Sequence, residues 1–129
     1  MTEMSRPARV SSYQDLEVWQ FAMDLVVSCY EVASALPAEE RFALASQIRR
    51  SAVSIPSNIA EGFGRHHTTD FIRFLRIAQG STKELETQLL ITVRVGYTTD
   101  HMIADHLSML DRVGRMLHAL IRSLADRAS

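Results

Sequence analysis

The chain has 129 residues, of which 47% are hydrophobic and 22% charged, and its net charge is −1. These values are typical of one globular domain, and they exclude an intrinsically disordered chain, a collagen-like repeat and a disulfide-stabilised miniprotein. No apolar stretch reaches the roughly 18 uncharged residues of a membrane span, and residues 1–10 lack the apolar core of a signal peptide. The single cysteine, Cys29, cannot form an internal disulfide, so the chain is predicted to be soluble and cytoplasmic.

Glycine and proline are sparse, and they fall where periodic apolar segments end, which predicts long helices rather than strands. The connections between these helices are short, so neighbouring helices should run antiparallel. We therefore predict an all-α, up-and-down antiparallel four-helix bundle over residues 12–129, preceded by a flexible N-terminal tail over residues 1–11. The four predicted helices cover residues 12–36, 37–61, 68–95 and 99–126.

The first helix carries two apolar stripes, and all of its charges are acidic. Ser12 can cap it, with Asp15 completing a capping box. Two stripes indicate either a wide core face in a tight bundle or a core face beside a subunit contact. One stripe contains Leu16, Trp19, Met23, Val26, Tyr30 and Ala33, and the other contains Val18, Phe21, Leu25 and Val32.

The second helix should begin at Pro37, because a proline in the first turn loses no amide hydrogen bond. Pro56 lies inside the apolar pattern, so we expect a kink or a break there. Ser54, Ser57 and Asn58 surround this proline and can satisfy the freed backbone groups. The apolar positions are Phe42, Ala45, Ile48, Ala52, Ile55 and Ile59.

The third helix can be capped by Thr68 or Thr69, with Asp70 in its first turn. Gly80 and Ser81 lie near its middle, and Gly costs about 1 kcal/mol relative to Ala inside a helix. A close approach of another helix is therefore expected at this point. The fourth helix has one apolar stripe beside a column of methionines that is typical of flexible core packing: Met102, Met109 and Met116.

The sequence predicts no enzymatic activity, no cofactor, no metal and no small-molecule substrate. A carboxylate-bridged di-iron bundle needs His three residues after Glu, and no helical Glu has one. His101 and His106 are five residues apart and point to different sides of a helix. Cys29 has no His or Arg within four residues and is expected to be an inert core residue. No phosphate-binding glycine loop or nucleophile elbow is present.

Thirteen of the fourteen basic residues are Arg, which forms forked hydrogen bonds to carboxylates and phosphates. Several lie on the second and third helices and could form a basic stripe opposite the acidic first helix. This stripe would either bind nucleic-acid phosphates or pair with acidic residues of a neighbouring subunit. The candidate contact residues are Arg49, Arg50, Arg65, Arg73, Arg76 and Lys83.

Three strings are similar to a known family: SYQDLEVWQ over residues 12–20, QIRRSAVSIPSNIAEG over 47–62, and FLRIAQGSTKELETQL over 74–89. They resemble the four-helix bundle proteins encoded within intervening sequences of bacterial 23S rRNA genes. The resemblance covers about residues 13–97 and implies a bundle assembled into a homopentameric ring. It implies no established activity. A distant similarity to accessory proteins of diversity-generating retroelements, which bind nucleic acid, implies RNA or DNA as a candidate partner.

The resemblance also implies structural pairings for the acidic residues of these strings. Glu61 would pair with Arg65 or with Arg73 across the turn, and the two glutamates of the third string, Glu84 and Glu86, would pair with Arg49, Arg50 or another subunit. Two functional hypotheses follow. One is a non-catalytic oligomeric scaffold that binds RNA or DNA, and the other is a protein–protein assembly module with no nucleic-acid contact.

Overall fold

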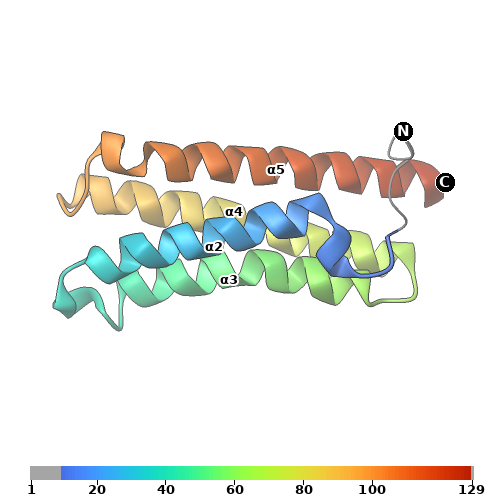
Figure 1. Ribbon diagram of the computed structural model, residues 1–129, viewed down its shortest axis with the longest axis horizontal. Coiled ribbons are helices and arrows are strands. Elements are labelled where there is room, and N and C mark those ends of the chain that lie inside the picture. Colours follow the sequence, from blue (N-terminus) through green and yellow to red (C-terminus); the bar gives the residue numbers. More distant parts are fainter. Residues whose placement is uncertain (1–9, 129) are drawn as a thin grey trace.

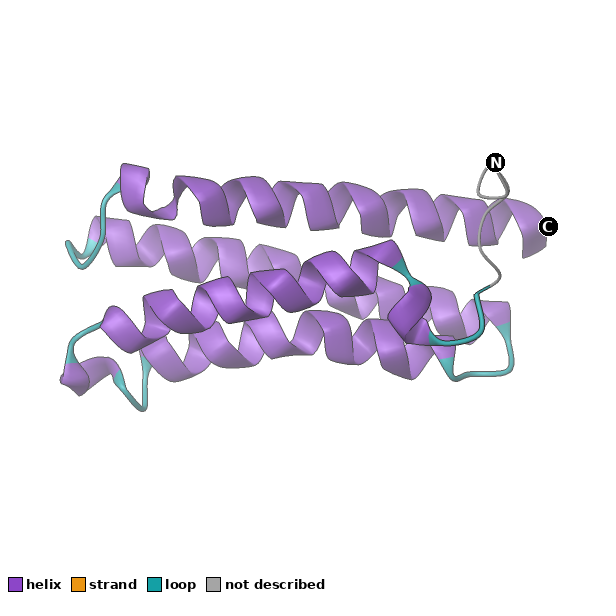
Figure 2. Cartoon of the chain, viewed as in Figure 1, coloured by secondary structure: helices purple, strands orange, loops and turns teal. Residues whose placement is uncertain are grey.

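The computed structural model describes residues 10–128, and this part of the chain folds as helices joined by short turns (Figure 1). No strand occurs within residues 10–128 (Figure 2). The predicted tail at residues 1–11 lies mostly outside the described residues. The long helices are α2 (Glu17–Ala35), α3 (Leu44–Phe63), α4 (Thr68–Arg94) and α5 (Asp100–Ala128), and short 3-10 helices cover Tyr13–Asp15 and Ala38–Glu40.

The four long helices occupy the corners of a square. Helix α2 packs against α3 and α5, and α4 packs against the same two helices, but α2 does not contact α4. Consecutive helices run antiparallel along one common direction (Figure 1). The predicted all-α, up-and-down four-helix bundle is therefore confirmed. Among the described residues, no helix combines the length and the apolar character that a membrane span needs.

The start of the first predicted helix is interrupted. The predicted capping box forms: Gln14 N donates to Ser12 Oγ at 3.1 Å, and Ser12 N donates to Asp15 Oδ2 at 3.1 Å. It caps the short 3-10 helix, however, because the backbone is extended at Leu16 before α2 begins. Backbone N–H donors of Ser11 and Ser12 lower the pKa of the Asp15 carboxyl below its ordinary value.

The second predicted helix starts later than expected. Pro37 does not open it: the chain passes through the 3-10 helix and a turn, and α3 begins at Leu44. The side chain of Glu40 holds this connection, because its Oε1 accepts from Leu44 N at 3.2 Å. Its Oε2 accepts from the Tyr97 hydroxyl at 2.7 Å, and this hydrogen bond raises the pKa of Tyr97. Phe42, expected in the core, lies in the turn and is 85% exposed.

Of the kink or break expected at Pro56, the break does not occur, because α3 continues through this residue. Proline removes one backbone donor, and packing against α2 and α4 on both sides keeps the remaining turns in place. Among the polar neighbours, Asn58 Nδ2 donates to the Ser54 carbonyl oxygen at 2.8 Å and to Ser54 Oγ at 3.0 Å, and neither bond reaches the Ala52 carbonyl that Pro56 leaves without its helical donor.

The third and fourth helices agree closely with their predicted ranges. The residue that caps α4 is His67 rather than Thr68 or Thr69, and its side chain makes no capping hydrogen bond. On α5, Met109 and Met116 pack at the edge of the core, whereas Met102 is 54% exposed.

The close approach predicted at Gly80 and Ser81 occurs only at the serine. The Ser81 hydroxyl lies 2.7 Å from the Ser54 hydroxyl, which joins α4 to α3. A Cβ added to Gly80 would meet no atom within 4 Å, so the prediction that another helix of the same chain approaches this glycine closely is wrong. The close contact that requires glycine is instead at Gly62, where an added Cβ would lie 2.8 Å from Phe74 Cβ.

Both apolar stripes on α2 pack against the core, and one of them also has exposed positions. The stripe that includes Val18 and Leu25 is buried, together with Ala22 and Cys29. In the other predicted stripe Ala33 is buried and Leu16, Trp19 and Val26 pack against the core, whereas Met23 is 39% and Tyr30 41% exposed. The alternative in which part of these stripes meets another subunit stays a prediction.

Candidate interaction surfaces

The described part of the chain offers no cluster suited to metal binding. No group of three or more His, Cys, Asp or Glu side chains comes together within residues 10–128. Cys29 is completely buried, and this burial raises the pKa of its thiol to about 12. The thiol is therefore protonated and unreactive at neutral pH, as predicted for a core residue.

The first two predicted contact residues, Arg49 and Arg50, are neighbours in sequence but face different helices. The guanidinium of Arg49 lies over the ring of Tyr30, 5.5 Å from its centroid, on the side of α2. Arg50 lines a shallow hollow between α3 and α4 together with Glu84 and Gln88. Neither arginine makes an ion pair within residues 10–128.

The structure brings Arg65 and Arg73 together at the turn between α3 and α4. Their guanidinium carbons lie 4.8 and 4.7 Å from the centroid of the Phe74 ring. Each also has a carboxylate partner: Arg65 pairs with Glu61 at 2.5 Å, as the resemblance implied, and Arg73 lies 3.9 Å from Asp70. Both cations are thus already partly neutralised within the chain.

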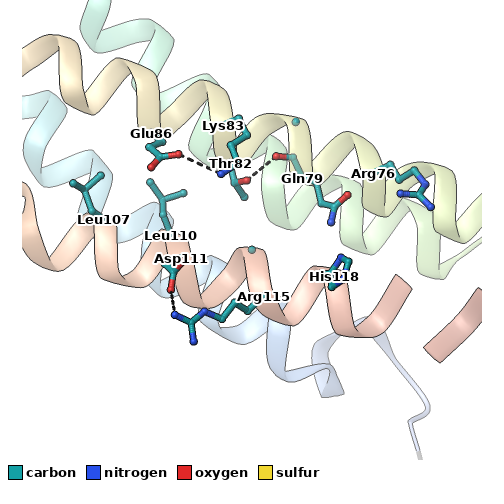
Figure 3. Close-up of a pocket in the computed structure, with 12 residues that line it drawn as sticks. Arg76, Gln79, Thr82, Lys83, Glu86, Leu107, Leu110, Asp111, Arg115 and His118 are labelled. Atoms are coloured by element: carbon teal, nitrogen blue, oxygen red, sulfur yellow. Dashed lines mark hydrogen bonds and ion pairs between the residues drawn. The ribbon is translucent and has the colours of Figure 1, made fainter. Parts of the chain in front are cut away.

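The remaining two candidates, Arg76 and Lys83, lie on α4 and line a groove between α4 and α5 (Figure 3). Lys83 Nζ is 3.5 Å from Glu86 Oε1, so Glu86 pairs along its own helix and not with Arg49 or Arg50. Arg76 makes no ion pair or hydrogen bond with any described residue.

The α4–α5 groove has a volume of about 650 Å³ and was not predicted. Leu107 and Leu110 supply apolar lining. Arg115 pairs with Asp111 at 2.6 Å on α5. Figure 3 shows Arg76 and His118 at one end of the groove, away from the carboxylates of Glu86 and Asp111. The ionisable lining residues are Arg76, Lys83, Glu86, Asp111, Arg115 and His118.

Two glycines within helices, Gly80 and Gly114, also line this groove. A Cβ added at either position would meet nothing within 4 Å, so packing within the chain requires neither glycine. Glycine inside a helix costs about 1 kcal/mol relative to alanine. The two glycines inside helices were the available sequence signal for this groove. Only Gly80 was interpreted from the sequence, as a site of close packing, and the groove was therefore not predicted.

Helix α2 presents a second exposed surface, the α2 outer face, formed by Met23, Asp24, Val27, Tyr30 and Glu31. Val27 is 62% exposed, more than any other large hydrophobic residue on this helix. A shallow hollow of about 490 Å³ lies beside it. Helix α2 has no basic residue, and neither Asp24 nor Glu31 makes an ion pair within residues 10–128.

The fold defines a class of protein: an all-α, antiparallel four-helix bundle with exposed apolar and charged side chains on its outer faces. Comparison with known families is more specific. The family of 23S rRNA-intervening sequence proteins matches residues 14–119, and this chain belongs to that family.

Similarity to a solved structure supports the same assignment. A crystal structure at 1.70 Å of a protein of unknown function, from the S23 ribosomal protein family of Bacteroides thetaiotaomicron, has a TM-score of 0.75 and 27% sequence identity to this chain. The match covers 81% of this chain and 97% of that one. No protein of curated function matches the chain.

Proposed function

We propose that this protein is a non-catalytic scaffold that self-associates, and that its assembly is a ring of five copies, as the family resemblance implies. The α2 outer face is the observation that carries this proposal. It combines exposed apolar side chains with carboxylates that have no cationic partner in the described part of the chain. Exposed apolar patches with a polar border are typical of protein–protein contacts.

The distribution of basic residues favours assembly over nucleic-acid binding. A surface that follows a phosphate backbone gathers its cations along one face. Here Arg65, Arg73 and Lys83 have carboxylate partners, and Arg49 lies against Tyr30. Arg50 and Arg76 remain, and they line different hollows.

The test measures mass and nucleic-acid binding in the same buffers. Light scattering at about 50 and 200 mM salt should give a multiple of the 14.5 kDa chain mass, near five copies. Fluorescent RNA and DNA fragments should not bind at the lower salt concentration. A 14.5 kDa species at micromolar concentration would contradict the scaffold. An oligomer whose RNA affinity falls steeply with salt would support the nucleic-acid scaffold in place of the assembly module.

A pair of variants makes the test specific to the α2 outer face. Val27→Asp places a charge among the exposed apolar side chains and should lower the mass to that of a single chain. Phe42→Asp is the matched control, because Phe42 is 85% exposed and lies outside this face. It should keep the wild-type mass, and circular dichroism should show full helix content in both variants.

A further inference from the structure

We propose that the α2 outer face of one copy docks, antiparallel, into the α4–α5 groove of the next copy. This inference rests on the proposed self-association and assigns the two surfaces that meet. Helix α2 is the acidic, apolar element in the contact, and the groove supplies the cations and the space. An amphipathic helix laid in a groove is a common mode of recognition between helical proteins.

The charges on the two surfaces have the same spacing. Asp24 and Glu31 are seven residues apart on α2, and Arg76 and Lys83 are seven residues apart on α4. Seven residues span about 10.5 Å along a helix and return to nearly the same face. An antiparallel alignment therefore brings Asp24 beside Lys83 and Glu31 beside Arg76 at the same time.

The shapes match in the same alignment. Val27 follows Asp24 by three residues, and Gly80 precedes Lys83 by three residues, so an antiparallel contact places the exposed valine at the glycine. Gly80 leaves open space there, and Gly114 does the same on the α5 side. A parallel alignment would shift the valine by one position and lose this match.

The groove also determines which charge pair contributes most. Lys83 already has Glu86 nearby, and Arg115 has Asp111. Arg76 has no carboxylate partner within residues 10–128, and His118 lies at the same end of the groove (Figure 3). Glu31 is therefore expected to be the principal acidic contact, with Arg76 as its partner.

The two surfaces lie on different helices that do not contact each other, α2 and α4, at opposite corners of the bundle. A contact between two different surfaces is head-to-tail. Such contacts produce a closed ring or an open filament rather than a two-fold dimer.

Charge exchange tests the proposed pairing. Glu31→Arg and Arg76→Glu should each reduce the mass in light scattering toward that of a single chain. The double variant carrying both changes should recover the wild-type mass, because the pair is restored with reversed polarity. Arg94→Glu is the matched control: it makes the same change on α4, at the last residue of the helix, and should leave the mass unchanged.

A steric variant tests the groove independently of charge. Gly80→Leu should dissociate the assembly because its side chain occupies the space assigned to Val27. The fold should survive, since a Cβ at this position meets no atom within 4 Å. The helix content by circular dichroism should therefore match that of the wild type. Ser57→Leu, an exposed position on α3, should keep the wild-type mass.

The outcomes separate this inference from the proposed function. A wild-type oligomer that persists in Gly80→Leu, Glu31→Arg and Arg76→Glu would overturn the pairing and leave the scaffold intact. A monomeric wild type would overturn both. Loss of RNA binding in Arg76→Glu with unchanged mass would show that the groove holds phosphates instead of α2, and would also overturn the pairing.

Discussion

Cys29 lies in the innermost layer of α2, and its surroundings determine its chemistry. Burial raises its pKa from 9.0 to about 12, because the thiolate would have to form in an apolar interior. Folding therefore stabilises the neutral thiol. This contribution is complete below pH 9, and it is lost as the pH rises toward 12.

We predict that Cys29 reacts with a thiol reagent only when the chain unfolds. At pH 8 the thiolate fraction is lower than that of a free thiol by about a thousandfold, and the side chain is also covered. Iodoacetamide labelling followed by mass spectrometry checks this, with a thiol introduced by Ser57→Cys on exposed α3 as the control. Equal labelling rates in the native protein would show that the core opens.

Residue-level predictions succeeded where partners lie within one helical turn. The pairing of Glu61 with Arg65 and the capping box of Ser12 with Asp15 are both confirmed, because helix geometry brings residues three and four apart together. The hydrogen bond between Tyr97 and Glu40 was not predicted. This bond depends on how the α2–α3 and α4–α5 connections pack against each other, and the spacing of apolar residues in the sequence does not predict such packing.

Near the turn between α3 and α4, Gly62 lies closer to its neighbours than any other described glycine does. We predict that Gly62→Ala destabilises the bundle by about 1–3 kcal/mol, the usual effect of overpacking. The added Cβ would lie 2.8 Å from Phe74 Cβ, 2.9 Å from Phe71 Cδ1 and 3.2 Å from the Phe71 carbonyl oxygen. Because Phe74 Cβ is bonded directly to the backbone, a side-chain rotation cannot relieve the shortest of these contacts.

Urea denaturation measures this prediction, and Gly64→Ala provides its control two residues away. There an added Cβ meets the Glu61 carbonyl oxygen at an ordinary 3.6 Å, and the backbone is already right-handed helical. Its free energy of unfolding should rise by up to about 1 kcal/mol. If both variants had equal stability, the close contact at Gly62 would not be a constraint.

Element predictions from periodicity were accurate for α4 and α5 and less so for the first two helices. The start of α3 is fixed by Glu40, whose side chain accepts from Leu44 N, and not by the helix preference of Pro37. The break expected at Pro56 did not occur, because tertiary packing outweighs a single lost backbone bond.

At the scale of the whole molecule, the fold was predictable and the contact surfaces were only partly so. Long periodic segments with short connections permit few arrangements other than an antiparallel bundle. On α2 the sequence predicted either a wide core face or a partial subunit contact, and the exposed Met23 and Tyr30 leave the subunit contact as a prediction. The groove was not, because it depends on how the α4 residues around Gly80 face those of α5 around Gly114, which periodicity alone does not specify.

The bond between Tyr97 and Glu40 also bears on the order of folding. It joins residues 57 positions apart, at the end of the bundle that carries both the α2–α3 and the α4–α5 connections (Figure 1). Closing so large a loop costs entropy, so this contact should form after the folding transition state.

We therefore predict that Tyr97→Phe accelerates unfolding in stopped-flow urea jumps and leaves the folding rate unchanged. Tyr13→Phe is the control, since the Tyr13 ring contacts Trp19 but its hydroxyl has no hydrogen bond among the described residues. Slower folding of the Tyr97 variant would place this contact in the nucleus instead. On the expected result, the bundle closes last, and begins to open, at the end that carries these two connections.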